Sequence, residues 1–126
     1  MNTTENNKMI AKFMGWGKDG DDWIIPPHLY TPFDIYELET GLYYFRLDST
    51  SLEFHKNWNW LMEVVQKIES LHEANNVLIG TNLTYVQIHN KVSNEQETFK
   101  GFSSIKIEAT YNACIEFIKW YNQQKQ

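Results

Sequence analysis

The sequence predicts an α+β fold, in which a small antiparallel sheet of about three strands packs with two main helices. Two long segments place apolar residues at helical spacing, and the stretch between them alternates in the manner of strands. Strands this close in sequence pair as an antiparallel meander. A chain of 126 residues buries enough surface for one core, so we expect a single domain over residues 1–126.

A short helix is expected near the N-terminus, because four apolar residues share one helical face: Met9, Ile10, Phe13 and Met14. Thr3 or Thr4 can cap its start. Gly15 supplies a stop after it.

The stretch from Trp16 to Phe54 is expected to be irregular, because glycines and prolines interrupt it. We expect residues 17–51 to form a long aromatic-rich loop region, with residues 42–47 extended. Its aromatic residues argue against disorder, and long loops in compact domains are often functional.

The second helix is expected from about Asn57, which can cap it, to Glu73. Its apolar stripe consists of Trp58, Leu61, Val65 and Ile68.

Three strands are then expected over residues 77–81, 83–91 and 95–99. In the second strand, period-two alternation puts three residues on each face: Thr84, Val86 and Ile88 on one, Tyr85, Gln87 and His89 on the other.

A last helix is expected to begin near Ser103 or Ser104 and to continue to about Gln123. Two apolar stripes lie side by side on it: one of Ile107, Tyr111, Cys114, Ile118 and Tyr121, the other of Ala109, Ala113, Phe117 and Trp120. An arc this wide predicts contact on two sides, with the sheet on one and another helix or another subunit on the other. We therefore expect a homo-oligomer.

The charge of the chain argues against general nucleic-acid binding. The formal net charge is −5, Arg46 is the only arginine, and the lysines are scattered, whereas a nucleic-acid-binding face clusters lysine and arginine. A small anionic ligand stays open, because a few lysines or a helix N-terminus can hold one.

The lone Cys114 falls on the apolar side of the last helix, where it is expected to be a small buried hydrophobe. One cysteine allows no disulfide within the chain. No signal peptide and no apolar run long enough to span a membrane is recognisable. We therefore expect a cytoplasmic protein with no membrane association.

No motif for a metal or a cofactor is apparent, and we expect neither. The acidic turn at residues 18–22 does not fit a calcium loop, since the twelfth position counted from Asp19 is Tyr30 and not glutamate. The four histidines lack the spacing of zinc ligands, and Gly15-Trp16-Gly17 is not followed by a helix, as a dinucleotide fingerprint requires.

The aromatic surplus is the strongest functional signal, because the chain has 7 phenylalanines, 7 tyrosines and 5 tryptophans. Flat rings, hydroxyls and one guanidinium in the loop region can stack a base and hold a phosphate or carboxylate, or anchor a protein partner. The candidate ligand-binding or partner-binding residues are Trp23, His28, Tyr30, Tyr43, Tyr44 and Arg46. The alternative is that these aromatics fold back over the sheet as a second small core.

Three sequence blocks support a resemblance: KMIAKFMGW at 8–16, LEFHKNWNWLM at 52–62 with VVQKIE at 64–69, and IEATYNACIEFIKWY at 107–121. Together they resemble short proteins encoded by phages and prophages, particularly those of Bacteroidetes hosts, and they are similar in layout to the phage ABA sandwich domain. The resemblance implies an accessory protein made in an infected bacterial cytoplasm, and it transfers no catalytic residue.

The leading functional hypothesis is a non-enzymatic binding protein that captures a host protein or a small anionic ligand such as a nucleotide signal, and so antagonises host defence. One alternative is a small nucleotide-directed hydrolase, with His28 or His55 as base and a carboxylate from the segment Asp19 to Asp22. Another is a component of the phage particle.

Overall fold

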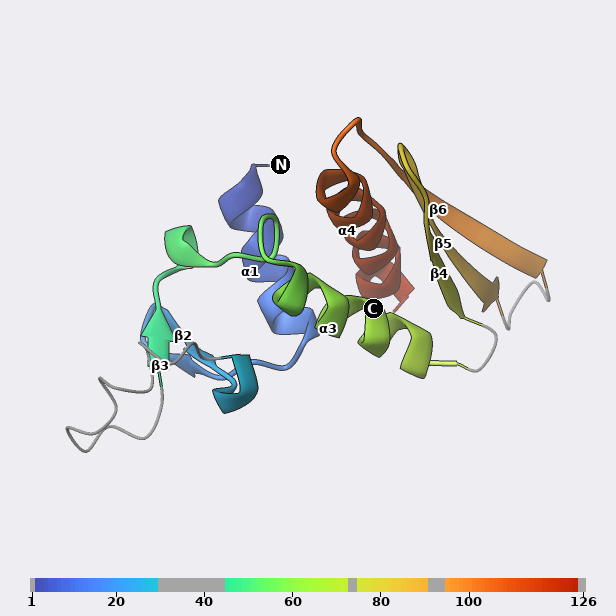
Figure 1. The fold of residues 1–126 in the computed structure, drawn as a ribbon. Helices are drawn as coiled ribbons and strands as arrows, with labels where there is room; N and C mark the ends of the chain where they lie inside the picture. The colour runs from blue at the N-terminus through green and yellow to red at the C-terminus, as the bar shows by residue number, and fades with distance from the viewer. Residues whose placement is uncertain (1, 30–44, 73–74, 91–94, 125–126) are drawn as a thin grey trace. The chain divides into compact units, whose positions relative to one another are not determined.

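The computed structural model describes residues 2–29, 45–72, 75–90 and 95–124. Its internal contacts group into two compact units, Met1–Glu53 and Phe54–Gln126. The mixed α+β architecture is as predicted, with helices and two three-stranded antiparallel sheets (Figure 1). The expectation that residues 1–126 form one domain stays a prediction.

The first unit begins with helix α1 (Thr3–Phe13). The prediction that Thr3 or Thr4 caps this helix is wrong, because the Oδ1 atom of Asn2 accepts the Glu5 backbone N–H at 2.8 Å. Asparagine is as good a cap as threonine or better, and it stands one residue earlier. Gly15 follows the helix at φ 77°, a left-handed conformation that glycine adopts without strain.

A small sheet occupies part of the segment that was expected to be irregular. Strands β1 (Lys18–Asp19), β2 (Asp22–Ile25) and β3 (Phe45–Leu47) pair antiparallel in the order β1-β2-β3. Gly20, at φ 64°, lies in the turn between β1 and β2. Strands β1 and β2, with two and four residues, are too short to reveal a period of two, which is why the sequence pattern missed them. The extended conformation expected over residues 42–47 is confirmed for Phe45–Leu47.

Two short 3-10 turns complete the described part of this unit: η1 (Pro27–Leu29) and η3 (Ser49–Ser51). Asp48 caps η3 by accepting the Ser51 backbone N–H at 3.0 Å. Hydrogen bonds from Thr50 and then Ser51 lower the pKa of this exposed carboxyl. A buried amide also ties the unit together, since Nδ2 of Asn7 in α1 donates to the Leu52 carbonyl at 3.0 Å.

The second unit begins with helix α3 (Trp58–Ser70). Its cap is Asn57, as predicted, and the Asn57 side chain accepts the backbone N–H groups of Asn59 and Trp60. The helix ends at Ser70, three residues before the predicted end at Glu73, which lies outside the described residues.

The predicted meander is confirmed in the second unit. Strands β4 (Asn76–Ile79), β5 (Leu83–Asn90) and β6 (Glu95–Phe102) pair antiparallel in the order β4-β5-β6. Strand β6 continues three residues beyond the predicted end at Phe99. Helix α4 (Lys106–Gln124) lies along one face of this sheet (Figure 1).

The start of α4 differs slightly from its prediction. Ser103 accepts the Ile105 backbone N–H at 3.1 Å, and the helix itself begins at Lys106. The expected two-sided contact of this helix is present within the chain, because α4 contacts β5 and β6 and also α3. A subunit contact on this helix stays a prediction.

The predicted alternation in β5 is also confirmed, because Thr84, Val86 and Ile88 are buried whereas Tyr85 and Gln87 are half-buried. We call the sheet side that carries the buried residues the inner face. Rings of β6 and α4 form an aromatic cluster beside it, in which Phe117 contacts Phe99, Trp120 and Tyr121 at centroid distances of 5.8 Å, 6.0 Å and 5.8 Å. Aromatic pairs at these distances add to the burial energy of the core.

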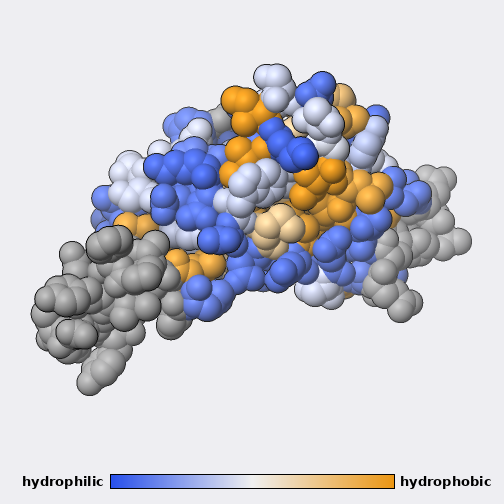
Figure 2. Space-filling view, viewed as in Figure 1, coloured by the Kyte–Doolittle hydropathy of each residue, from blue (hydrophilic) through white to orange (hydrophobic). Residues whose placement is uncertain are grey.

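Apolar residues also reach the surface of this protein. In the space-filling view they gather among polar residues on the side of the second unit that carries α4 (Figure 2). None of the described helices is long and apolar enough to cross a lipid bilayer.

Candidate functional site

Trp23 and Arg46, two of the predicted binding residues, lie on neighbouring strands of the first sheet. In the register of β2 and β3, Trp23 pairs with Leu47, and Arg46 pairs with Ile24. Three other predicted residues, Tyr30, Tyr43 and Tyr44, lie outside the described residues. The structure therefore brings together part of the predicted set, and the binding role of the set stays a prediction.

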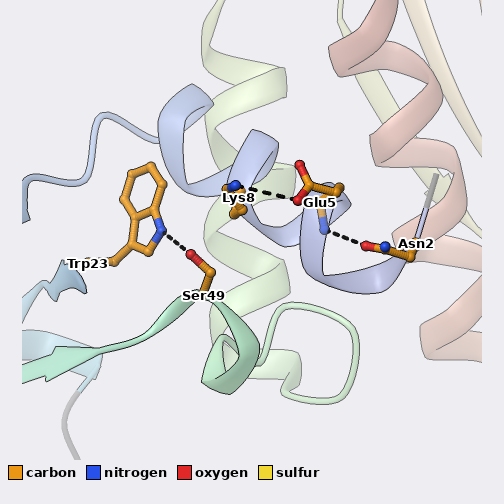
Figure 3. A network of polar contacts seen from close by, with 5 residues as sticks. All are labelled: Asn2, Glu5, Lys8, Trp23 and Ser49. Carbon is orange, nitrogen blue, oxygen red and sulfur yellow. Dashed lines mark hydrogen bonds and ion pairs between the residues drawn. The ribbon is translucent and has the colours of Figure 1, made fainter. Parts of the chain in front are cut away.

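The Trp23 ring belongs to the interior of the first unit, because only 4% of its surface is exposed. Its Nε1 donates to the Ser49 hydroxyl at 3.2 Å, which satisfies the one polar atom of the indole (Figure 3). The Lys18 ammonium lies 4.9 Å from the ring centroid. A ring covered in this way stabilises the sheet and offers little surface to a stacked guest.

The Arg46 guanidinium forms an ion pair with the Asp19 carboxylate, and both side chains are partly exposed. This pair neutralises the one arginine of the chain and one of the carboxylates proposed for a hydrolase. An anionic ligand at Arg46 would therefore compete with Asp19 for the same guanidinium.

His28 lies exposed in η1, three residues after the end of β2. His55 lies in the second unit, where its ring meets the buried Tyr111 ring edge-on at 6.1 Å between centroids. The ring contact helps to fix the segment ahead of α3 against α4. Within the described ranges, no three side chains among histidine, cysteine, aspartate and glutamate are grouped so that they could hold a metal ion.

A second candidate surface, which sequence reasoning missed, is the side of the β4-β5-β6 sheet that faces away from α4. We call it the outer face and define it by the residues whose side chains alternate with those of the inner face: Asn76, Leu78, Leu83, Tyr85, Gln87, Gln96, Thr98, Lys100 and Phe102. Within the second unit no described helix covers this face (Figure 1).

The outer face exposes large apolar side chains. Phe102 is 66% exposed and Leu78 is 44% exposed. In the strand register Leu78 is opposite Tyr85, and Leu83 is opposite Phe102. These four side chains therefore form an apolar strip across all three strands, a type of surface that marks interaction sites more often than isolated exposed residues do.

Lys100 is the one charged side chain of this outer face, and it is turned onto the strip. Its ammonium lies 5.8 Å from the centroid of the Tyr85 ring, which is half-buried on the neighbouring strand. The cation therefore adds electrostatic contact with the ring face. A face with aromatic and apolar residues, neutral amides and a single cation has the composition of the centre of a protein interface.

The signal that could have found this surface was the alternation in β5. That pattern put Tyr85 and Gln87 on the side opposite the buried residues. Extending it to Leu78 and Phe102 required the strand register, which local sequence specifies weakly.

Comparison of the chain with protein-family models, with curated proteins and with solved structures finds no match.

Proposed function

We propose that this chain is a binding protein that presents the outer face of its second sheet to a protein partner. The observation that carries the proposal is the apolar strip of Leu78, Tyr85, Leu83 and Phe102. Leu78 and Phe102 in it are exposed, and the other two side chains are half-buried. A flat strip of this kind suits another protein surface, in which rings and aliphatic side chains are buried at the centre and polar groups surround them.

A protein partner is favoured over a small anion because the cation at each candidate surface already contacts another side chain of the protein. On the outer face the one cation is Lys100, which already lies over the Tyr85 ring. In the first unit Arg46 is paired with Asp19. The resemblance to phage and prophage proteins supports a partner among the proteins of an infected bacterial host, in keeping with an accessory role in the bacterial cytoplasm.

Site-specific photo-crosslinking in the bacterial cytoplasm tests this proposal. Benzoylphenylalanine is placed at Phe102 or at Leu78, and irradiation should yield one covalent adduct of discrete mass with a host protein. Trp58 is the matched control, because its ring is also partly exposed, at 37%, but lies at the start of α3 and outside the outer face.

A second arm checks the same surface without a reactive group. The double variant Leu78→Ser, Phe102→Ser should lose the partner in a pull-down, whereas Trp58→Ser should retain it. Identical adducts at positions 58, 78 and 102, or no adduct with another protein at 78 and 102, would rule out the outer face as the binding surface.

A further inference from the structure

The second sheet has two edge strands, β4 and β6. They differ in whether side chains bond to their outward backbone groups. On β4, the Val77 backbone N–H donates to Oε2 of Glu69 at 3.1 Å. Next to it, Nδ2 of Asn75 donates to the Ile68 carbonyl at 2.9 Å. The Glu69 side chain of α3 therefore occupies the outward N–H of Val77 on the β4 edge, as is common where a sheet edge must not pair further.

The β6 edge has no backbone partner among the described residues over most of its length. The Ser103 N–H bonds back to the Asn82 carbonyl, which continues the β5–β6 ladder. Because hydrogen-bonded positions alternate in an antiparallel pair, the backbone groups of Gln96, Thr98, Lys100 and Phe102 point away from β5. No described residue pairs with these groups, and the four side chains are exposed.

Natural edge strands are often protected by charged side chains that extend beyond the edge. In β6 the described charged side chains are directed elsewhere. The Lys100 ammonium lies over Tyr85 on β5. Glu97 alternates onto the inner face, and its Oε2 is buried without a hydrogen-bond partner among the described residues. Neither side chain therefore screens the outward backbone groups.

The charge of the second unit favours a particular occupant. Residues 54–126 contain seven lysines, seven glutamates and no arginine or aspartate, so their formal net charge is zero. The whole net charge of −5 belongs to residues 1–53. Two copies of the second unit can therefore approach each other without net repulsion.

We propose that β6 pairs antiparallel with β6 of a second copy across a two-fold axis at Thr98, which joins two three-stranded sheets into one sheet of six strands. This register places Thr98 opposite Thr98 and Lys100 opposite Gln96, and both are favourable or neutral cross-strand pairs. A register centred on Glu97 or on Lys100 would instead place like charges directly opposite each other. The outward groups of Gln96, Thr98 and Lys100 would then make about six backbone hydrogen bonds.

The pairing does not depend on the proposed partner-binding function. It uses the edge of the sheet, whereas a partner would use the outer face. If both hold, the dimer presents two outer faces side by side in one continuous sheet.

The variant Thr98→Pro tests the pairing by removing one outward N–H. Proline is tolerated on an edge strand where its nitrogen faces solvent, so the ladder between β6 and β5 is retained. Light scattering coupled to size-exclusion chromatography should give twice the 15.0 kDa chain mass for the native sequence and 15.0 kDa for Thr98→Pro, with unchanged circular dichroism. A native sequence that stays at 15.0 kDa at all concentrations overturns the proposal and leaves the edge to a strand of another protein.

Disulfide trapping provides a second test, which does not depend on how the proline variant folds. Paired residues in this ladder have Cα atoms about 5.5 Å apart, within the range of a disulfide. Under mild oxidation, Thr98→Cys should form a covalent dimer at least about tenfold more than Gln96→Cys, whose two copies lie four residues out of register. A mixture of Gln96→Cys with Lys100→Cys should cross-link, because these positions face each other.

The native thiol does not interfere with this experiment, because Cys114 is fully buried in α4. Cross-linking of Gln96→Cys as efficient as that of Thr98→Cys would overturn the register. The register would also be overturned if a mixture of Thr98→Cys and Lys100→Cys formed a covalent dimer while Thr98→Cys alone formed none.

Discussion

Gly101 in β6 lies directly against Ala109 in α4, with no room for a side chain between them. A Cβ atom built on Gly101 would lie 2.0 Å from the Ala109 carbonyl oxygen and 2.4 Å from the Ala113 backbone nitrogen. Because both atoms belong to the helix backbone, no rotamer change can relieve the overlap. The hydrogen at this position therefore sets how closely α4 approaches the sheet.

The first prediction is that Gly101→Ala destabilises the second unit by at least about 2 kcal/mol, since the helix must move away and its packing is lost. Urea unfolding followed by far-UV circular dichroism measures the change. Gly17→Ala is the matched control, because its added Cβ would meet only the Ile24 side chain at 3.4 Å. If both variants lose the same stability, the close approach does not determine the packing.

The second prediction concerns the buried hydroxyl pair between β5 and α4. The Thr110 hydroxyl donates to the Lys106 carbonyl, so the Thr84 hydroxyl donates the 3.0 Å bond to Thr110. Thr110→Val leaves the fully buried Thr84 hydroxyl unpaired, at a cost of about 1–3 kcal/mol. Thr84→Val removes the donor itself and should cost less.

The double variant Thr84→Val, Thr110→Val should cost less than the sum of the two single changes, because neither hydroxyl is then left unpaired. Urea unfolding of all four proteins completes the cycle. Additive losses would show that the two hydroxyls are not coupled.

The third prediction concerns the protection of the β4 edge. Glu69→Ala leaves the Val77 N–H without its carboxylate partner. We expect faster hydrogen exchange at the Val77 amide, measured by nuclear magnetic resonance, because this group then opens to solvent locally. Glu69→Gln should stay near the native rate, since its side-chain carbonyl can still accept. An unchanged rate in Glu69→Ala would mean that another group protects this amide.

The fourth prediction follows from the buried thiol. Burial raises the pKa of Cys114 from 9.0 to about 12. Between these values the unfolded chain releases a proton that the folded chain retains. The contribution of the neutral thiol to the free energy of unfolding is therefore fully present below pH 9. As the pH rises from 9 toward 12, the free energy of unfolding falls by about 1.4 kcal/mol per pH unit.

Urea unfolding at a series of alkaline pH values measures this slope. Cys114→Ala is the control, because it retains every lysine and tyrosine and removes only the thiol. Its free energy of unfolding should fall less steeply with pH than that of the native protein. Equal slopes would show that the thiol ionises in the folded state as readily as in the unfolded chain.

The sequence allowed prediction of the elements with enough residues to show a period. The apolar stripe after Asn57 located α3, and the alternation at Thr84, Val86 and Ile88 assigned the faces of β5. The burial of Cys114 followed from its place on the apolar side of α4. By contrast, β1 and β2 have too few residues for a pattern, so their pairing with β3 into a sheet could not be anticipated.

For the candidate sites too, the sequence predicted some features and the tertiary structure decided others. Residue chemistry singled out Trp23 and Arg46 as binding groups, but chemistry alone does not reveal that Ser49 and Asp19 occupy their polar atoms. The apolar strip that includes Leu78 and Phe102 depends on strand register, which local sequence specifies weakly.

Local periodicity was therefore sufficient for the helices, the meander and the buried side of its central strand, because each depends on neighbours a few residues apart. Packing between distant segments decided which rings are covered, which cations are paired and which backbone N–H of the β4 edge donates to a side chain. Those outcomes depend on groups far apart along the chain, such as Glu69 beside Val77 or Gly101 against Ala109. A local sequence pattern does not predict contacts between residues this far apart in the chain, because burial and pairing are determined only when the segments pack together.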